Sequence, residues 1–180
     1  MPQTTLLSET ITFAICYAES TGTTTDSTWQ DSYLRFQMTK LRSIVASSVS
    51  HDTIGQISSF AATSLTYAGS LGNNKWIALV DQTLNNNYPC NSGTVTADSL
   101  DSTHSGSLRG TTDPHGSGSE KVVTFNTLGL STSVVFAVCY TEADGTLSAT
   151  WIDTAIRLTV SKLSTLQYST PHPSLPPLLV

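Results

Sequence analysis

Apolar and polar side chains alternate over residues 33–41, and a second segment at residues 156–161 repeats the alternation. The apolar positions are Leu34, Phe36 and Met38 in the first segment and Ile156, Leu158 and Val160 in the second. A period of two places successive side chains on opposite faces of a β-strand. Both segments are therefore predicted to be strands with one face in a hydrophobic core.

Further strands are predicted from apolar runs of strand length that are separated by turn residues. They cover residues 11–17, 58–69, 75–81 and 121–126 and the run that begins at Phe136, with residues 93–98 as a shorter candidate. Both alternating faces of residues 75–81 are apolar, which is typical of a central strand. No segment has the period of a long amphipathic helix. The chain is therefore expected to be all-β, with short strands packed as a sandwich.

Two segments lack a strand pattern. Residues 42–52 are rich in Ser and are predicted to be a connector that opens the complete repeat described below. Residues 100–120 are rich in Ser, Gly, Thr, Asp and His and have no periodicity. Such a segment is predicted to be a long surface loop.

One long stretch of sequence occurs twice. Residues Phe136–Leu163 repeat Phe13–Leu41, with Cys16 matching Cys139, Trp29 matching Trp151, Asp31 matching Asp153, Arg35 matching Arg157 and Lys40 matching Lys162. Cys139 lies 123 positions after Cys16, and Trp151 lies 122 positions after Trp29, so the alignment needs one gap. This spacing is an ordinary domain size and indicates a tandem repeat.

The repeat predicts the domain organisation. We expect Ig-like β-sandwich repeats, with one complete copy at residues 42–163 and the C-terminal strand pair of a preceding copy at residues 1–41. Residues 164–180 would form a Pro-rich tail or the first strand of a following copy. Because residues 5–41 align with the interior of the complete copy, Met1 is expected to lie inside a longer protein.

Hydroxyl side chains replace charged ones over much of the predicted surface. Charged residues make up 12% of the chain, about half the usual share, whereas Ser and Thr make up roughly 30%. A β-rich fold explains part of this bias because Thr suits strands, and O-linked glycosylation of an extracellular chain is the alternative. No Asn-x-Ser/Thr sequon occurs. The candidate glycosylation positions are Thr23, Thr24, Thr25, Ser169, Thr170, Pro171, Pro173 and Ser174.

The net charge of −5 argues against a nucleic-acid partner, which requires a basic surface. No apolar run approaches the roughly 18 residues of a membrane-spanning helix. The first residues also lack the basic and apolar regions of a signal peptide, so any signal would lie upstream of Met1.

The three cysteines bear on the cellular compartment. Cys90 and Cys139 are a candidate disulfide within the complete repeat, and Cys16 would pair with an equivalent cysteine outside this chain or in a neighbour. The alternative is three free buried cysteines in a cytosolic protein. A Ser/Thr-rich chain with few charges fits an oxidising compartment, so an extracellular or cell-surface location is expected.

The sequence contains no motif for nucleophilic catalysis or nucleotide binding. His104, His115, Asp101 and Asp113 could imitate a metal site, but their spacing matches no zinc or calcium pattern. Acidic residues in the two equivalent turns could hold calcium, although Asp and Gly also form turns by themselves. These acidic residues are Glu19, Asp26, Asp31, Glu142, Asp144 and Asp153. We expect no enzymatic activity, no metal site and no cofactor.

In the complete repeat, Trp76-Ile77-Ala78-Leu79-Val80 is followed by Cys90 and then by Phe136-Ala137-Val138-Cys139-Tyr140. This order resembles the Ig-like modules of large protist and algal surface proteins, some of which build extracellular fibrils such as mastigoneme-like flagellar hairs. The resemblance implies a disulfide between Cys90 and Cys139, a scaffolding role and no catalysis. Trp76 precedes the first cysteine, so the strand assignment of antibody domains does not carry over.

The expected function is that of a structural subunit of an extracellular, glycosylated fibre, in which copies of the repeat pack or exchange strands end to end. Its partners would be copies of itself and glycans. The residues expected to serve assembly are Phe13, Ile15, Leu34, Phe36, Met38, Trp29 and Trp151. A structural cap at one end of the sandwich is the competing role for the two tryptophans. The alternative function is a cell-surface adhesin or carbohydrate-binding module that uses the loop at residues 100–120 and the tryptophans.

Overall fold

A computed structural model describes residues 7–112, 121–163 and 165 of the chain. Its strands are β1 (Thr12–Tyr17), β2 (Gln30–Gln37), β3 (Leu41–Ala46), β4 (Val49–His51), β5 (Ile54–Ile57), β6 (Thr63–Gly69), β7 (Trp76–Asp81), β8 (Leu108–Arg109), β9 (Thr111–Thr112), β10 (Lys121–Phe125), β11 (Phe136–Thr141) and β12 (Ile152–Val160). Three short helical turns, α1 (Leu84–Asn87), η1 (Pro89–Asn91) and α2 (Gly93–Thr96), lie between β7 and β8. The prediction of an all-β chain is confirmed.

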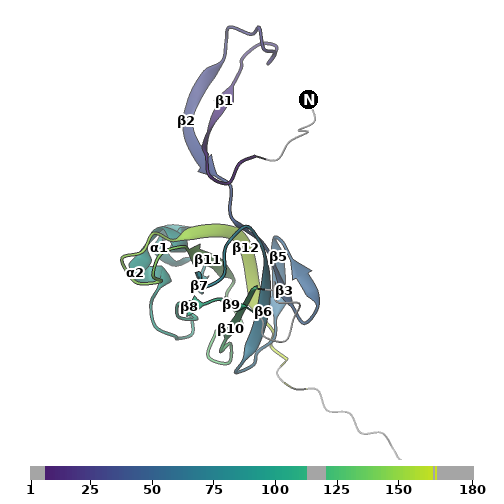
Figure 1. Cartoon of the computed structure of the whole chain (residues 1–180), viewed down its shortest axis with the longest axis vertical. Helices are drawn as coiled ribbons and strands as arrows, with labels where there is room; N and C mark the ends of the chain where they lie inside the picture. Colours follow the sequence, from purple (N-terminus) through teal and green to yellow (C-terminus); the bar gives the residue numbers. More distant parts are fainter. Residues whose placement is uncertain (1–6, 113–120, 164, 166–180) are drawn as a thin grey trace, which may run out of the picture.

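The strands from β3 onward form two five-stranded sheets. The first sheet has the order β4-β3-β6-β10-β9, and the second has the order β5-β12-β11-β7-β8. Neighbouring strands are antiparallel, except that β5 runs parallel to β12. We call this body, residues 41–163, the two-sheet domain. Strands β1 and β2 form a separate two-stranded sheet that projects away from it (Figure 1).

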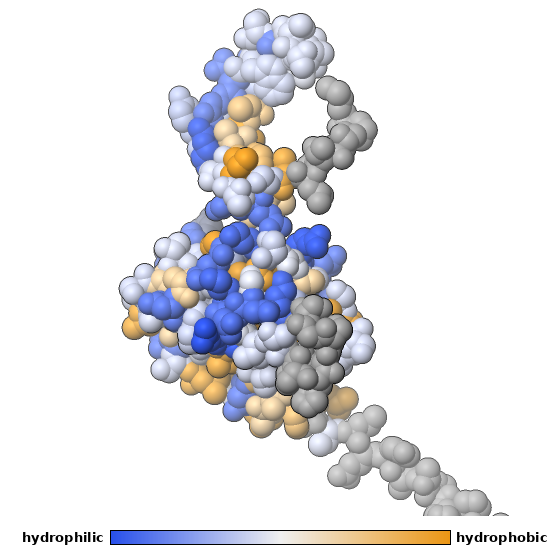
Figure 2. Space-filling model, in the orientation of Figure 1, coloured by the Kyte–Doolittle hydropathy of each residue, from blue (hydrophilic) through white to orange (hydrophobic). Residues whose placement is uncertain are grey.

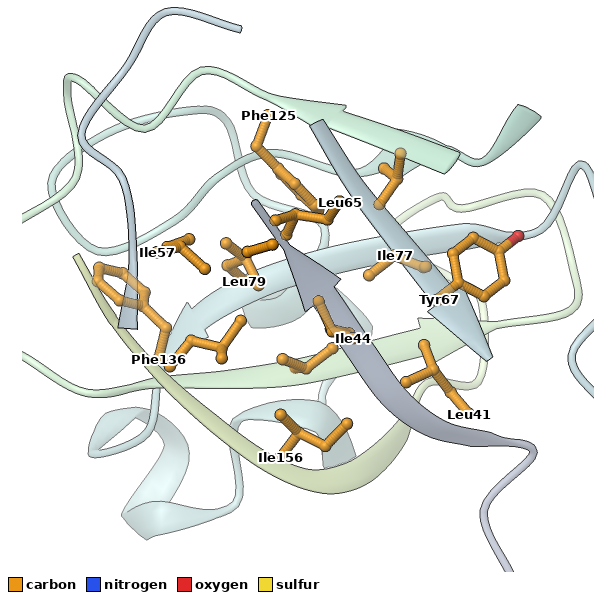
Figure 3. Close-up of a cluster of buried hydrophobic side chains, with 14 of the residues drawn as sticks. Leu41, Ile44, Ile57, Leu65, Tyr67, Ile77, Leu79, Phe125, Phe136 and Ile156 are labelled. Atoms are coloured by element: carbon orange, nitrogen blue, oxygen red, sulfur yellow. The ribbon is translucent and has the colours of Figure 1, made fainter. Parts of the chain in front are cut away.

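A hydrophobic core fills the space between the two sheets. Leu65 and Phe125 from the first sheet and Ile77 and Leu79 from the second are fully buried in it (Figure 3). The apolar positions of β12 predicted from the alternation, Ile156, Leu158 and Val160, all belong to this core. The two sheets therefore contribute side chains to one shared core.

The second face of β7 is also buried, as its two apolar faces predict. Ala78 and Val80 pack with Ala137 and Trp151 in a smaller cluster on the outer side of the second sheet. The cluster includes Cys90, which lies in the helical excursion between β7 and β8. The excursion therefore covers the outer face of the sheet, and β7 lies between β11 and β8.

Several local predictions were wrong. The predicted connector at residues 42–52 contains β3 and β4, and a bulge between Leu41 and Ser43 explains the error because it breaks the period of two. The short strand candidate at residues 93–98 is the helical turn α2, in which the Thr96 hydroxyl donates to the Ser92 carbonyl. The candidate at residues 58–69 begins as strand only at Thr63.

A disulfide joins Cys90 to Cys139, the pair that the family resemblance implies, with a Cα–Cα distance of 5.5 Å. Cys139 lies in β11, and both cysteines are buried. The bond therefore ties the helical excursion to the middle of the second sheet.

Removing the disulfide is expected to destabilise the two-sheet domain. The bond closes a loop of 49 residues, and the chain-entropy model assigns about 4 kcal/mol to a loop of that length. In urea denaturation, a Cys90→Ala/Cys139→Ala double variant should lose stability of this order. The Cys16→Ala control should have the same unfolding midpoint as the parent. Equal midpoints for the parent and the double variant would contradict this.

Candidate assembly site

The projecting sheet and the strand pair β11–β12 have the same pairing register. In β1–β2, Phe13 lies opposite Phe36 and Cys16 opposite Asp31. In β11–β12, Phe136 lies opposite Leu158 and Cys139 opposite Asp153. The register shifts between Ala14 and Cys16 in the first pair and between Ala137 and Cys139 in the second. We call β1, β2 and their connecting loop, residues 12–37, the hairpin.

The hydrogen bonds around this bulge are also the same in the two copies. Arg35 donates to both carboxylate oxygens of Asp31, at 2.8 and 2.6 Å, and Arg157 donates to those of Asp153, at 2.8 and 2.7 Å. The hydrogen bond from Arg35 holds the pKa of Asp31 below its ordinary value, with help from the Tyr33 amide. Local sequence therefore suffices to build this bulge.

Backbone conformation follows the same equivalence. Tyr33 and Ala155 both have positive φ, at 61° and 64°, two residues after the paired aspartate. In the connecting loops, Gly22 and Gly145 have φ of 65° and 70°. The Trp29 indole donates to the Thr23 carbonyl at 3.0 Å, and the Trp151 indole donates to the Thr146 carbonyl at 3.3 Å. The two strand pairs are thus copies in backbone, bulge and turn.

Burial distinguishes the copies. Leu34 is 61% exposed, whereas its equivalent Ile156 is 0% exposed. Other exposed residues of the hairpin with buried equivalents include Ala14 (Ala137), Ile15 (Val138), Tyr17 (Tyr140), Trp29 (Trp151), Phe36 (Leu158) and Cys16 (Cys139). Met38, just after β2, is likewise exposed where Val160 is buried. Hydrophobic residues lie open along the visible side of the hairpin (Figure 2).

Among the predicted assembly residues, Trp151 is buried in the two-sheet domain, and Phe13 is the partial exception within the hairpin. It is half-buried because its ring stacks on Phe36 across the hairpin, with ring centroids 5.5 Å apart. This contact covers only part of one face. A free two-stranded hairpin is marginally stable in water, so the remaining apolar face favours a partner.

A short junction joins the hairpin to the two-sheet domain. The Lys40 amide donates to the Tyr140 hydroxyl at 3.1 Å, and the Lys40 ammonium pairs with the Glu142 carboxylate at 2.5 Å. The hydrogen bond to Glu142 raises the pKa of Lys40. Ser70 also donates to the carboxylate of Glu9, which precedes β1.

Gly69 makes the junction possible. Its φ is +124°, and a Cβ at this position would lie 2.1 Å from the Lys40 carbonyl oxygen. The same carbonyl accepts a hydrogen bond from the Leu71 amide. The backbone between β2 and β3 can therefore pass this close to β6 only where residue 69 has no side chain.

The sequence analysis assigned no role to the junction residues. The repeat nevertheless indicated one, because these residues recur in both copies. Lys40 matches Lys162, and the register of the two strand pairs makes Tyr17 and Glu19 the counterparts of Tyr140 and Glu142. The groups that hold the linker thus occur in both copies.

The predicted surface loop at residues 100–120 is partly built into the second sheet. His104 and Ser105 are buried beside β7, where the Ser105 amide donates to the Leu79 carbonyl. Burial acts to raise the pKa of Asp101, but hydrogen bonds from Thr103 and His104 outweigh it and lower that pKa to about 2. Beyond β8 and β9, His115 and Asp113 lie outside the described residues.

Five of the six acidic residues considered as calcium ligands have protein partners for their carboxylates. Asp153 pairs with Arg157, Glu142 pairs with Lys40, and Asp144 accepts hydrogen bonds from Thr146. Hydrogen bonds from Thr28, with contributions from Gly22 and Thr21, hold the pKa of Asp26 well below its ordinary value. Within the part of the chain that the structure describes, no group of three or more His, Cys, Asp or Glu residues could hold a metal ion.

The glycosylation candidates fall into two groups. Thr23, Thr24 and Thr25 are exposed in the loop of the hairpin. Ser169, Thr170, Pro171, Pro173 and Ser174 lie outside the described residues. Among the residues that are described, no helix is long and apolar enough to cross a membrane.

No protein-family model, curated protein or solved structure matches this chain.

Truncation of Ile156 and of its equivalent Leu34 should give a large and a small loss of stability, respectively. Ile156→Ala removes buried methyl and methylene groups from the core and is expected to cost about 3 kcal/mol. Leu34→Ala removes an exposed side chain and is expected to change stability by less than about 0.5 kcal/mol. Urea denaturation of the full chain, followed by far-UV circular dichroism, measures both. Similar losses in both variants would show that the hairpin face is covered in the isolated chain.

Substitution of Gly69 should destabilise the junction. Gly69→Ala places a methyl group against the Lys40 carbonyl in a strained backbone conformation, so we expect a loss on the order of 2 kcal/mol. Gly129→Ala is the matched control, because a Cβ there meets nothing within 4 Å. Thermal denaturation of both variants tests the difference, and a parent-like melting temperature for Gly69→Ala would refute the steric argument.

Proposed function

We propose that the chain is a structural subunit of an extracellular, glycosylated protein fibre built from Ig-like β-sandwich repeats joined end to end. One observation carries the proposal. The hairpin has the register, bulge and apolar face of β11–β12, yet its apolar face is open to solvent whereas that of β11–β12 is buried. A strand pair with these properties is the exposed half of an assembly contact.

The short junction supports assembly in a line. Only residues 38–40 separate β2 from β3, and the Lys40 contacts to Tyr140 and Glu142 limit how the two parts can rotate. Because the residues that make these contacts have counterparts in both copies, the same junction can recur along a chain of repeats. Repeats that contact only their neighbours form extended structures.

The chemistry of the surface supports an extracellular location. A buried disulfide fits a secreted protein, since such bonds persist in oxidising compartments. The few charges, the many hydroxyl groups and the exposed Thr23–Thr25 cluster suit a chain solvated in part by O-linked glycans. The similarity of the cysteine and tryptophan motifs to algal surface modules points in the same direction.

The carbohydrate-binding alternative has less support. Trp151, one of its proposed contacts, is 4% exposed, and its indole bonds to the backbone of its own loop. His104 and Ser105 of the proposed binding loop are buried against β7. These side chains hold the fold together and are closed to a glycan.

Immunogold electron microscopy of native material tests the fibre. Antibodies against the two-sheet domain should decorate extracellular filaments at a regular axial spacing, because each repeat presents the same surface. A preimmune serum is the control. Labelling confined to the cell interior, or to isolated particles on the surface, would overturn the proposal.

A further inference from the structure

We infer that the exposed hairpin binds a module of the same repeat that carries strands equivalent to β3–β10 and lacks its own last strand pair. The inference deepens the proposed function and rests on its premise that copies are joined end to end. Its basis is the equivalent pair β11–β12, since among the described residues one strand pair has its cover and the other does not. The strands that cover β11–β12 therefore indicate what kind of surface would cover the hairpin.

The core defines the chemistry of the partner. Val138, Tyr140 and Ile156 are buried against side chains of the first sheet, among them Ile44 and Leu65. Their hairpin equivalents Ile15, Tyr17 and Leu34 present similar apolar groups at the same positions of the same backbone. A module with an apolar sheet at the place of β3, β6 and β10 would therefore cover them.

The open edges of the hairpin define the pairing. Strand β11 pairs with β7, so that Val138 lies opposite Leu79 and Tyr140 opposite Ile77. Strand β12 pairs with β5 in parallel, from Arg157 opposite Ile54 to Val160 opposite Ile57. By equivalence, β1 would pair with a β7-type strand, and the segment Arg35–Met38 with a β5-type strand.

Cys16 adds a covalent contact to this fit. It occupies the position of Cys139, opposite Asp31 in place of Asp153, and is exposed. In the covered copy this position bonds to Cys90 in the helical excursion after β7. The partner module would supply a cysteine at the Cys90 position, and oxidation of the two thiols by the disulfide-forming oxidants of a secretory compartment would join them, with loss of two protons and two electrons.

A second copy of the same chain does not meet this requirement. Its own β11–β12 already fills the place that the hairpin would take, so insertion would displace one strand pair for each pair that it covers. The exchange leaves the number of uncovered apolar faces unchanged and gives no net burial. A module without its own last strand pair gains the whole face, which is why we assign it as the partner.

The test adds such a module to the full chain. Residues 41–126 are placed ahead of Met1 of the 180-residue chain, so that the hairpin follows a β3–β10 module through a loop similar in length to residues 126–135. Hydrogen exchange of the β1 and β2 amides should slow by ~100-fold or more relative to the parent chain, because the hairpin would open only with its new domain. Peptide mapping should find Cys16 bonded to the added cysteine.

Two variants of the extended chain separate specific packing from a general effect of the extension. Leu34→Asp places a charge in the proposed core and should restore fast exchange in the hairpin. Leu128→Asp alters a similarly exposed leucine of the two-sheet domain and should leave the protection intact. Fast hairpin exchange and an alkylatable Cys16 in the extended chain, with the rest of the protein protected, would overturn the inference.

The remaining outcomes identify other occupants and separate this test from that of the fibre. A parent chain that dimerises in analytical ultracentrifugation, with hairpin protection that rises with concentration, would assign the face to a second copy and overturn the inference. A protected hairpin without extracellular filaments would remove the fibre and keep this interface. Extracellular filaments together with an unprotected hairpin in the extended chain would keep the fibre and overturn this interface.

Discussion

Burial of the apolar faces of one strand pair is the interaction on which this structure depends. β11 and β12 form the middle of the second sheet, and their side chains fill the core on one face and surround the disulfide on the other. Burying one large aliphatic side chain contributes about 1.5–3 kcal/mol. The hairpin carries the same residue types at the same positions, and its exposed side chains contribute little until a partner covers them.

The two copies separate local from tertiary causes of structure. The bulge, the positive φ at Tyr33 and Ala155 and the Asp–Arg pairs are the same in the buried and in the exposed copy. These features are therefore set by short-range contacts, such as the hydrogen bond from the residue 33 or 155 amide to the preceding aspartate. Exposure differs because the strands that cover a pair come from distant parts of the sequence.

Most strands could be predicted from periodicity, and the errors have identifiable causes. The bulge at Leu41–Ser43 hid β3, because one extra residue reverses the faces of every following side chain. Residues 101–109 read as an irregular loop, yet the backbone around His104 and Ser105 bonds to β7 and extends the sheet. The junction of Lys40 with Tyr140 and Glu142 was missed because its partners are about 100 residues apart.

The sequence by itself determined the repeat, the equivalence of Cys16 with Cys139, the all-β class and the faces of the strands that bear apolar groups. Alternation reports which side chains can be buried together, and repetition reports that two segments share one local structure. The tertiary structure alone decided which copy is covered, where Gly69 lets the linker pass and which partners hold Lys40. These outcomes depend on contacts between segments far apart in the chain, about which no short-range pattern carries information.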